Sequence, residues 1–343
     1  MLSTAVLKIL GVLLVMFSTT LLPPLVIALM GHDSGVTAFA LAYLATIMSG
    51  LLLWLPLRHK QRELRVRDGF LIVVLFWTVL AVFGALPLLL SPDPQLSMTD
   101  ALFESMSGLT TTGATILTGI DSLPPSILYY RQQLQWLGGM GIIVLAVAVM
   151  PMLGVGGMQL YRAETPGPMK DTKLTPRITE TAKALWYIYL GLTVSCGLAY
   201  WLSGMSIFDA VGHAFSTVAI GGFSTHDQSM GFFDSPTISL IASGFMLISA
   251  VNFALHFTVV RARSPRAYLR DPEVRAFAGF VSLVILITLV ILLFWNVYSS
   301  IGDTLWHGVF QVISIGTTTG FTTTGFHWWP SFLPVMLIIM SAV

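Results

Sequence analysis

Long apolar runs separated by short polar stretches dominate this chain. A helix that crosses the hydrocarbon core of a bilayer, about 30 Å thick, needs about 20 consecutive apolar residues. The runs that reach this length are residues 6–30, 36–57, 69–90, 132–155, 182–204, 235–259 and 276–298. A further run begins near Ser331 and reaches Val343. The pattern therefore predicts an all-α polytopic membrane protein.

The composition agrees with this fold class and narrows the function. Hydrophobic residues make up 55% of the chain and charged residues 10%, with a mean hydropathy of +0.83, whereas soluble domains carry roughly 25% charged residues. The net charge of +1 gives no basic excess, which argues against nucleic acid as the main partner. Cys196 is the only cysteine, so the chain can form neither an intrachain disulfide nor a cysteine-based metal site.

The basic residues predict the orientation in the membrane, because Lys and Arg concentrate in cytoplasmic loops. Apart from Lys8 and Arg131, all of them fall in three connections, at residues 58–67, 162–183 and 261–275. The connections between these are acidic. They hold Asp33, Asp93, Asp100, Glu104, Asp121, Asp209, Asp227, Asp234 and Asp303. We therefore expect the N-terminus and the basic connections to be cytoplasmic and the acidic connections to face outward.

The outer segments share an internal repeat. Residues 100–113 align without a gap onto residues 209–222, and residues 307–320 keep a Ser and the final Gly at the same separation. Ahead of each copy a Ser is followed three residues later by an Asp, which is typical of a helix start. These pairs are Ser97 with Asp100, Ser206 with Asp209, and Ser300 with Asp303. The third pair lies further from its final glycine, so the third short helix should start about one turn earlier.

Each copy predicts a short helix that enters the membrane from outside and ends at a loop rich in Thr or Gly. Irregular backbone at membrane depth is tolerated only where it is buried in protein or lines a water-filled cavity. The C-terminal end of a helix favours a cation, and glycine permits left-handed backbone angles. We interpret the loops as a cation selectivity filter, in which carbonyl oxygens replace the hydration shell. The candidate site residues are Thr111, Thr112, Gly113, Ile220, Gly221, Gly222, Thr318, Thr319 and Gly320.

Close helix packing is the alternative explanation for runs of small residues. We prefer it for Gly138, Gly139 and Gly141, which follow no capped helix. Arg131 keeps two explanations, because it could pair with an outer acid or snorkel to the interface. Glu104 is undecided, although together with the outer aspartates it could concentrate cations. Asn252 and His256 lie one helical turn apart in the run 235–259, which predicts a hydrogen bond between helices.

The motifs around the loops resemble those of the Trk/Ktr/HKT superfamily of potassium transporters, most closely the membrane subunit of the bacterial Trk system. They are SGLTTTGA at residues 107–114, LQWLGGMGI at 134–142, FSTVAIGGFSTHD at 215–227 and TTTGFTTTG at 317–325. The resemblance covers the whole chain. It implies four helix, pore loop, helix units around one pore, with K⁺ as the transported ion. It also implies a homodimer in the bacterial inner membrane and a cytoplasmic TrkA-type nucleotide-binding regulatory subunit.

On this pattern we divide the chain into an N-terminal helix pair with its basic loop, residues 1–67, and three pore units. The pore units are residues 68–160, residues 161–262 with the preceding cytoplasmic loop, and residues 263–343. The third unit ends inside its second helix and no fourth copy is present, so we expect a fourth filter loop in a longer chain.

The leading functional interpretation is potassium uptake through a channel-like pore with a backbone-carbonyl filter. The alternative is a secondary carrier with alternating access that couples K⁺ to Na⁺ or H⁺. Such carriers often contain inverted repeats, whereas all three copies here are expected to start on the inside, which favours a central pore. The sequence contains neither a nucleophile elbow nor a His-based metal-ligand spacing. We therefore expect neither enzymatic activity nor a cofactor.

Overall fold

The computed structural model describes residues 4–60, 66–139, 141 and 178–342, and all regular structure within these residues is helical. This confirms the predicted all-α fold class. The chain forms two compact units. Unit 1 comprises Met1–Thr110 and Ala114–Trp186, and unit 2 comprises Thr111–Gly113 and Tyr187–Val343. The stretch Thr111–Gly113 thus belongs to unit 2, although the chain on both sides of it belongs to unit 1.

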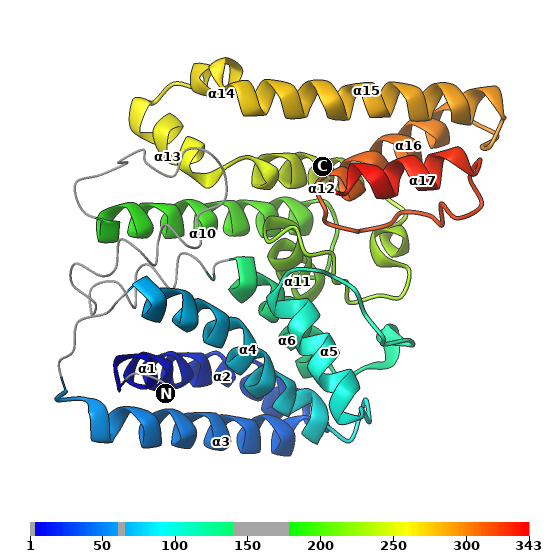
Figure 1. Cartoon of the computed structure of the whole chain (residues 1–343). Helices are drawn as coiled ribbons and strands as arrows, with labels where there is room; N and C mark the ends of the chain where they lie inside the picture. The colour runs from blue at the N-terminus through cyan, green and yellow to red at the C-terminus, as the bar shows by residue number, and fades with distance from the viewer. Residues whose placement is uncertain (1–3, 61–65, 140, 142–177, 343) are drawn as a thin grey trace. The chain divides into compact units, whose positions relative to one another are not determined.

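Unit 1 contains an N-terminal group of helices followed by the first copy of the repeat. Its elements are α1 (Thr4–Thr19), α2 (Leu22–Gly31), α3 (Val36–Trp54), η1 (Leu55–Leu57), α4 (Val66–Leu90), α5 (Met98–Leu109), η2 (Ile120–Ser122) and α6 (Pro125–Gly139). Helices α1 and α3 lie side by side (Figure 1) and approach closely at Gly11 and Gly50. A Cβ built on Gly11 would lie 2.8 Å from the Gly50 carbonyl oxygen. Small residues permit this close approach of two membrane helices.

Polar contacts fix the position of α6 within unit 1. Asp33 follows α2, and its carboxylate accepts hydrogen bonds from the Ser126 amide at 3.1 Å and the Ser126 hydroxyl at 3.0 Å. Further along α6, the buried Tyr130 donates a hydrogen bond of 2.8 Å to the Gly84 carbonyl oxygen of α4. The start and the middle of α6 are therefore both tied to other helices.

Glycines within α6 and just after it permit close contacts with neighbouring elements in unit 1. A Cβ built on Gly138 would overlap the carbonyl oxygen of Leu109, the last residue of α5. A Cβ on Gly141 would lie 3.0 Å from the ring of Trp77. The predicted packing role is confirmed for these two glycines. As a result, α6 supports the point where α5 ends and the first Thr/Gly loop begins.

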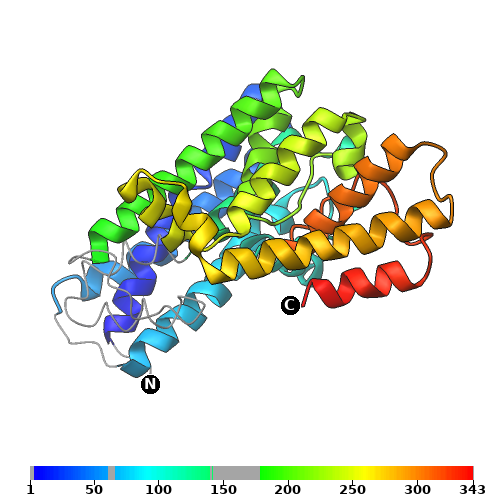
Figure 2. The same ribbon diagram turned by 90° about the horizontal axis from the view of Figure 1, so that it is seen from above.

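Unit 2 contains the second and third copies of the repeat. Helix α10 (Ile178–Leu202) begins in unit 1 and continues into unit 2. The further elements are α11 (Ile207–Val218), η5 (Ser229–Phe233), α12 (Pro236–Ala250), α13 (Phe253–Ala262), α14 (Arg266–Arg270), α15 (Pro272–Phe294), α16 (Ile301–Gly316) and α17 (Phe332–Met340). Both views show α16 beside α15 (Figure 1 and Figure 2), and α12 and α17 also pack against α16.

Most of the predicted membrane spans are present as helices. The segments long and apolar enough to cross a membrane are Thr4–Gly31, Val36–Leu57, Arg67–Leu90, Lys183–Leu202 and Pro272–Phe294. They agree with five of the predicted runs. The run 132–155 is described only as far as residue 141, with α6 covering its beginning, and its remainder lies outside the described residues. Helix α17 lies in the last predicted run.

The predicted span over residues 235–259 is present as a pair of helices with a break between them, which the sequence did not predict. Helices α12 and α13 are bent by 93° at the break between them. Val251 has an extended backbone, with φ −74° and ψ 141°, and the Asn252 side-chain oxygen then accepts the Ala254 amide at 3.0 Å. Asn competes for backbone hydrogen bonds inside a helix but stabilises a helix start. The apolar run therefore contains two helices.

The break also determines which of Asn252 and His256 forms the predicted hydrogen bond between helices. Asn252 does not take part in it, because this side chain caps α13. His256 does, since its ring nitrogens lie 2.7 Å from the Tyr268 hydroxyl on α14 and 3.0 Å from the Ile248 carbonyl oxygen on α12. The prediction is thus wrong for Asn252 and confirmed for His256.

Candidate functional site

Each copy of the repeat begins with a capped short helix. The hydroxyl oxygens of Ser97, Ser206 and Ser300 accept the amide of the Asp three residues later, at 3.2, 3.0 and 2.9 Å. These contacts start α5, α11 and α16. Helix α16 has 16 residues, whereas α5 and α11 have 12 each, so the third helix starts one turn earlier. The predicted caps and the predicted offset of the third helix are both confirmed.

Removing a cap should weaken its short helix. We expect Ser206→Ala to lower the free energy of unfolding by about 1 kcal/mol, because the Asp209 amide loses its acceptor. Ser206→Asn should keep most of this stability, since Asn also caps well. Thermal unfolding in detergent measures both variants. Equal midpoints for the wild type and the alanine variant would contradict the assignment.

Left-handed residues alternate in the loop that follows each helix. After the role predicted from the sequence, we call residues 111–113, 220–222 and 318–320 the filter loops. The last residue of each loop is a glycine with positive φ: 74° at Gly113, 81° at Gly222 and 84° at Gly320. Two positions earlier, φ is also positive: 55° at Thr111, 48° at Ile220 and 61° at Thr318. Such angles are rare for β-branched residues and cost of order 1–3 kcal/mol, so three occurrences at one repeated position indicate a shared constraint.

Hydrogen bonds to the preceding helices hold two of these loops. The Gly221 amide donates to the Ser216 carbonyl oxygen, and the Thr319 amide donates to the Ser314 carbonyl oxygen, both at 2.8 Å. Gly221 and Thr319 occupy the same position in their copies. The backbone of each loop therefore turns back onto the last turn of its helix, where helical carbonyl groups would otherwise lack partners.

The three filter loops meet within unit 2. A Cβ built on Gly113 would overlap the carbonyl oxygen of Gly221, and one built on Gly222 would overlap the carbonyl oxygen of Thr319. The first loop thus contacts the second, and the second contacts the third, through backbone atoms. Only glycine fits at these two contacts. Of the predicted site residues, Thr112, Thr318 and Gly320 are exposed, whereas Gly221 and Thr319 are buried.

A serine close to the end of each helix distinguishes the copies. Ser107 donates a hydrogen bond of 2.6 Å to the Ala114 carbonyl oxygen, and Ser314 donates one of 2.7 Å to the Phe321 carbonyl oxygen. Each contact ties the helix to the residue just after its filter glycine. Ser216 occupies the same position in the second copy. It is fully buried, and its hydroxyl has no hydrogen-bond partner among the described residues.

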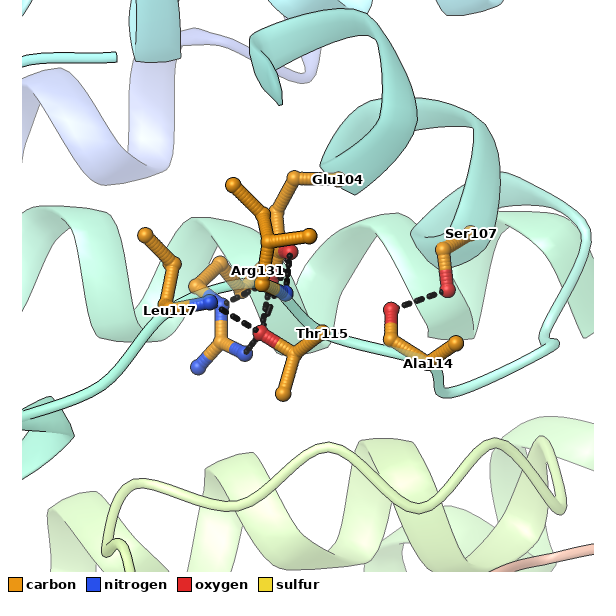
Figure 3. A network of polar contacts seen from close by, with 7 residues as sticks. Glu104, Ser107, Ala114, Thr115, Leu117 and Arg131 are labelled. Atoms are coloured by element: carbon orange, nitrogen blue, oxygen red, sulfur yellow. Dashed lines mark hydrogen bonds and ion pairs between the residues drawn. The ribbon is translucent and has the colours of Figure 1, made fainter.

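A buried ion pair lies behind the first copy, in unit 1 (Figure 3). Arg131 of α6 donates through Nε to Glu104 of α5 at 2.8 Å, and both side chains are at most 1% exposed. Thr115, two residues after the filter glycine, donates to both Glu104 carboxylate oxygens, at 2.9 and 3.0 Å. Arg131 also reaches the Thr115 hydroxyl at 3.0 Å. Arg131 therefore pairs and does not snorkel, and the buried Glu104 cannot concentrate cations at an outer surface.

Sequence reasoning did not find this support, although a signal was present. Glu104 aligns with His213 and with Gln311 in the other copies, so each short helix carries a large polar residue nine positions before its final glycine. Large polar residues are seldom fully buried without partners. Their recurrence in apolar helices was the available clue. No group of three His, Cys, Asp or Glu side chains within the described residues could hold a metal ion.

The helices and loops define a class of protein: a multi-pass membrane protein with a candidate ion site built from backbone atoms. Residues 35–343 match the TrkH family model, described as a cation transport protein. The chain therefore belongs to the TrkH family, in agreement with the resemblance seen in the sequence.

Individual relatives support this membership. The chain is 59% identical over 338 residues to the Trk system potassium uptake protein TrkH of Halomonas elongata, covering 98% of this chain and 70% of that protein. It is 56% identical over 339 residues to the protein of the same name from Escherichia coli K12, covering 99% and 70%. The crystal structure of the potassium transporter TrkH from Vibrio parahaemolyticus matches with a TM-score of 0.88 and 51% identity, covering 99% and 70%.

Proposed function

We propose that this protein takes up K⁺ across the bacterial inner membrane through a channel-like pore whose selectivity filter is made of the three filter loops. The observation that carries the proposal is the meeting of these loops through backbone atoms at Gly113, Gly221, Gly222 and Thr319. Rings of carbonyl oxygens can replace the hydration shell of K⁺. The potassium uptake function named for the relatives agrees with this chemistry.

The alternating backbone supplies the geometry that such a site needs. Left-handed angles at the first and third position of each loop turn the backbone sharply twice within three residues. Each loop directly follows the C-terminal end of a short helix, where the helix dipole favours positive charge. Backbone oxygens are hard ligands suited to an alkali cation, and their position depends on backbone angles more than on side-chain identity. Ile220 in the second loop is compatible with this chemistry.

A carrier with alternating access is the second candidate function. The observation that favours it is the break between α12 and α13, because carriers use discontinuous helices at their binding sites. The distribution of basic residues favours the channel-like pore instead, because it predicts that all three copies enter the membrane from the same side. The two mechanisms differ in how flux depends on other ions.

Reversal potentials in planar bilayers test the proposal. For a K⁺-selective pore, we expect the potential of zero current to follow the K⁺ gradient and to stay constant when Na⁺ or pH gradients are imposed. Coupled transport of K⁺ with Na⁺ or H⁺ would move it with the second gradient. Equal currents in K⁺ and in Na⁺ would overturn the filter assignment itself.

The remaining expectations about this protein's surroundings stay predictions. The cytoplasmic N-terminus rests on the distribution of basic residues. The homodimer and the TrkA-type regulatory subunit rest on the resemblance to the superfamily. The basic residues of α13 and α14, among them Arg261 and Arg270, lie in the connection predicted to face the cytoplasm.

A further inference from the structure

We propose that Glu104, His213 and Gln311 are positioning residues that hold the outer end of each filter loop and thereby set the discrimination between K⁺ and Na⁺. This inference rests on the proposed function. All three side chains are 0% exposed, and all lie nine residues before a filter glycine. They come from three different helices, α5, α11 and α16. We call them the buttress residues.

Each buttress residue contacts the chain just beyond its own filter glycine. Glu104 accepts the Thr115 hydroxyl and, at 3.3 Å, the Ile116 amide. His213 Nε2 lies 2.8 Å from the Ser224 hydroxyl. Gln311 donates through Nε2 to the Thr324 carbonyl oxygen at 2.6 Å. The contacted residues follow the glycine by two to four positions in every copy. A carboxylate, an imidazole and an amide therefore each form a hydrogen bond to the segment after the filter glycine.

The hydrogen-bond partners define the tautomer of His213, the second buttress residue. His213 Nδ1 lies 2.9 Å from the Asp209 carbonyl oxygen, which can only accept, so Nδ1 carries the proton. In the neutral ring Nε2 then accepts the hydrogen bond from Ser224. Because its two nitrogens have fixed and opposite roles, this imidazole connects the start of α11 to the segment after the filter.

Charge is balanced behind the first loop. Glu104 is charged, but Arg131 pairs with it at 2.8 Å, while the third buttress residue is a neutral amide. A net charge close to an ion site would act on every cation that passes. The pairing of Glu104 with Arg131 leaves the hydrogen-bonding geometry in place without such a net charge. We therefore assign the buttress residues to geometry and not to attraction of cations.

This geometry bears on ion selectivity. In the second and third copies, hydrogen bonds to the end of the helix hold the loop before the glycine, and in all three copies the buttress residue holds the segment after the glycine. A carbonyl ring distinguishes two cations of equal charge through the positions and number of its oxygens. If the hydrogen bond from the buttress residue is lost, the carbonyl oxygens of the loop can move closer together and coordinate Na⁺, the smaller ion. Anchoring side chains of this kind hold a site within the narrow tolerance that binding requires.

Matched pairs of variants in the full chain separate anchoring from packing. In the second copy, His213→Met removes the polar contact at similar size, and His213→Gln keeps a polar group. In the first copy, we compare two double variants: one combines E104M with R131M, and the other combines E104Q with R131M. Both double variants lack the ion pair, but only the second retains an acceptor for Ile116. In the third copy, Gln311→Met removes a single contact. The measurement is the K⁺/Na⁺ permeability ratio from reversal potentials.

We expect each Met variant to lower the permeability ratio roughly five- to tenfold and each Gln variant to restore it to within about twofold of the wild type. A purely structural role would reduce the amount of folded protein without changing this ratio, because reversal potentials do not depend on the number of molecules. Thr288→Val is the control, since it removes a buried hydroxyl that has no partner among the described residues. It should leave the ratio unchanged.

Three outcomes overturn the inference, the first of them together with the proposed function and the other two without it. A wild type that does not prefer K⁺ over Na⁺ overturns the proposed function and this inference with it. A selective wild type whose Met variants remain equally selective overturns this inference alone. The same holds if the Met and Gln variants lose selectivity to the same extent, because the polar contact would then not be the cause. If a double variant fails to fold, Gln311→Met and the His213 pair decide the question.

Discussion

Alanine in place of Gly113 or Gly222 should lower K⁺ uptake roughly 100-fold. The added Cβ meets a carbonyl oxygen of the next filter loop, Gly221 for the first variant and Thr319 for the second. In addition, alanine disfavours the left-handed backbone conformation that both glycines adopt. Backbone strain of about 2–3 kcal/mol at the loop corresponds to about two powers of ten in rate. Uptake of K⁺ into proteoliposomes with an imposed membrane potential measures the effect.

Gly119→Ala is the matched control for this prediction. Gly119 has a φ of 67°, close to that of Gly113, but its added Cβ would meet only the Ser122 hydroxyl, at 3.6 Å. This variant should carry the cost of left-handed backbone, about 1–2 kcal/mol in stability, and still transport K⁺. Equal loss of transport in Gly119→Ala and Gly113→Ala would show that left-handed strain in general, and not contact between loops, limits uptake.

The second large effect is expected at Gly138, which packs against the end of α5. Gly138→Ala should lower the free energy of unfolding by about 3 kcal/mol, at the upper end for overpacking, because the obstructing atom is the Leu109 carbonyl oxygen. A backbone atom cannot move aside as a flexible side chain can. Since Leu109 ends α5, the displacement should also reach the first filter loop. Thermal unfolding in detergent and K⁺ uptake together measure both consequences.

Gly279→Ala provides the control for a glycine inside a membrane helix. Gly279 lies in α15, and nothing lies within 4 Å of an added Cβ. Alanine favours the helix by about 1 kcal/mol relative to glycine, so this variant should be as stable as the wild type or more so. If Gly138→Ala were equally well tolerated, α6 would not be packed against the end of α5 as described.

The fold was largely predictable because its signals are local. A serine cap depends on residues three positions apart, and a membrane span depends on an uninterrupted apolar run, so both can be recognised in the sequence. The break at Val251 was not predicted, because its local signal is weak. The residues around it are apolar and fit a helix, and a single Asn gives little warning that its side chain will cap a new helix.

The candidate site was predictable only in part. Glycine at the end of each filter loop suggests positive φ, and the structure has it there. Positive φ at Thr111, Ile220 and Thr318 could not be predicted, because β-branched residues rarely adopt positive φ. Tertiary contacts impose it. The ion pair between Glu104 and Arg131 is likewise a contact over 27 positions, and residue types alone left pairing and snorkelling equally compatible with the sequence.

The three filter loops differ in sequence while sharing one backbone, and this has an evolutionary consequence. In an assembly of identical subunits, one mutation changes every loop around the pore at once. Here the copies are joined in a single polypeptide, so each loop and each buttress residue can mutate alone. Position 220 holds Ile where positions 111 and 318 hold Thr, and Glu, His and Gln occupy the equivalent positions 104, 213 and 311. A substitution in this chain therefore changes one copy of the repeat at a time.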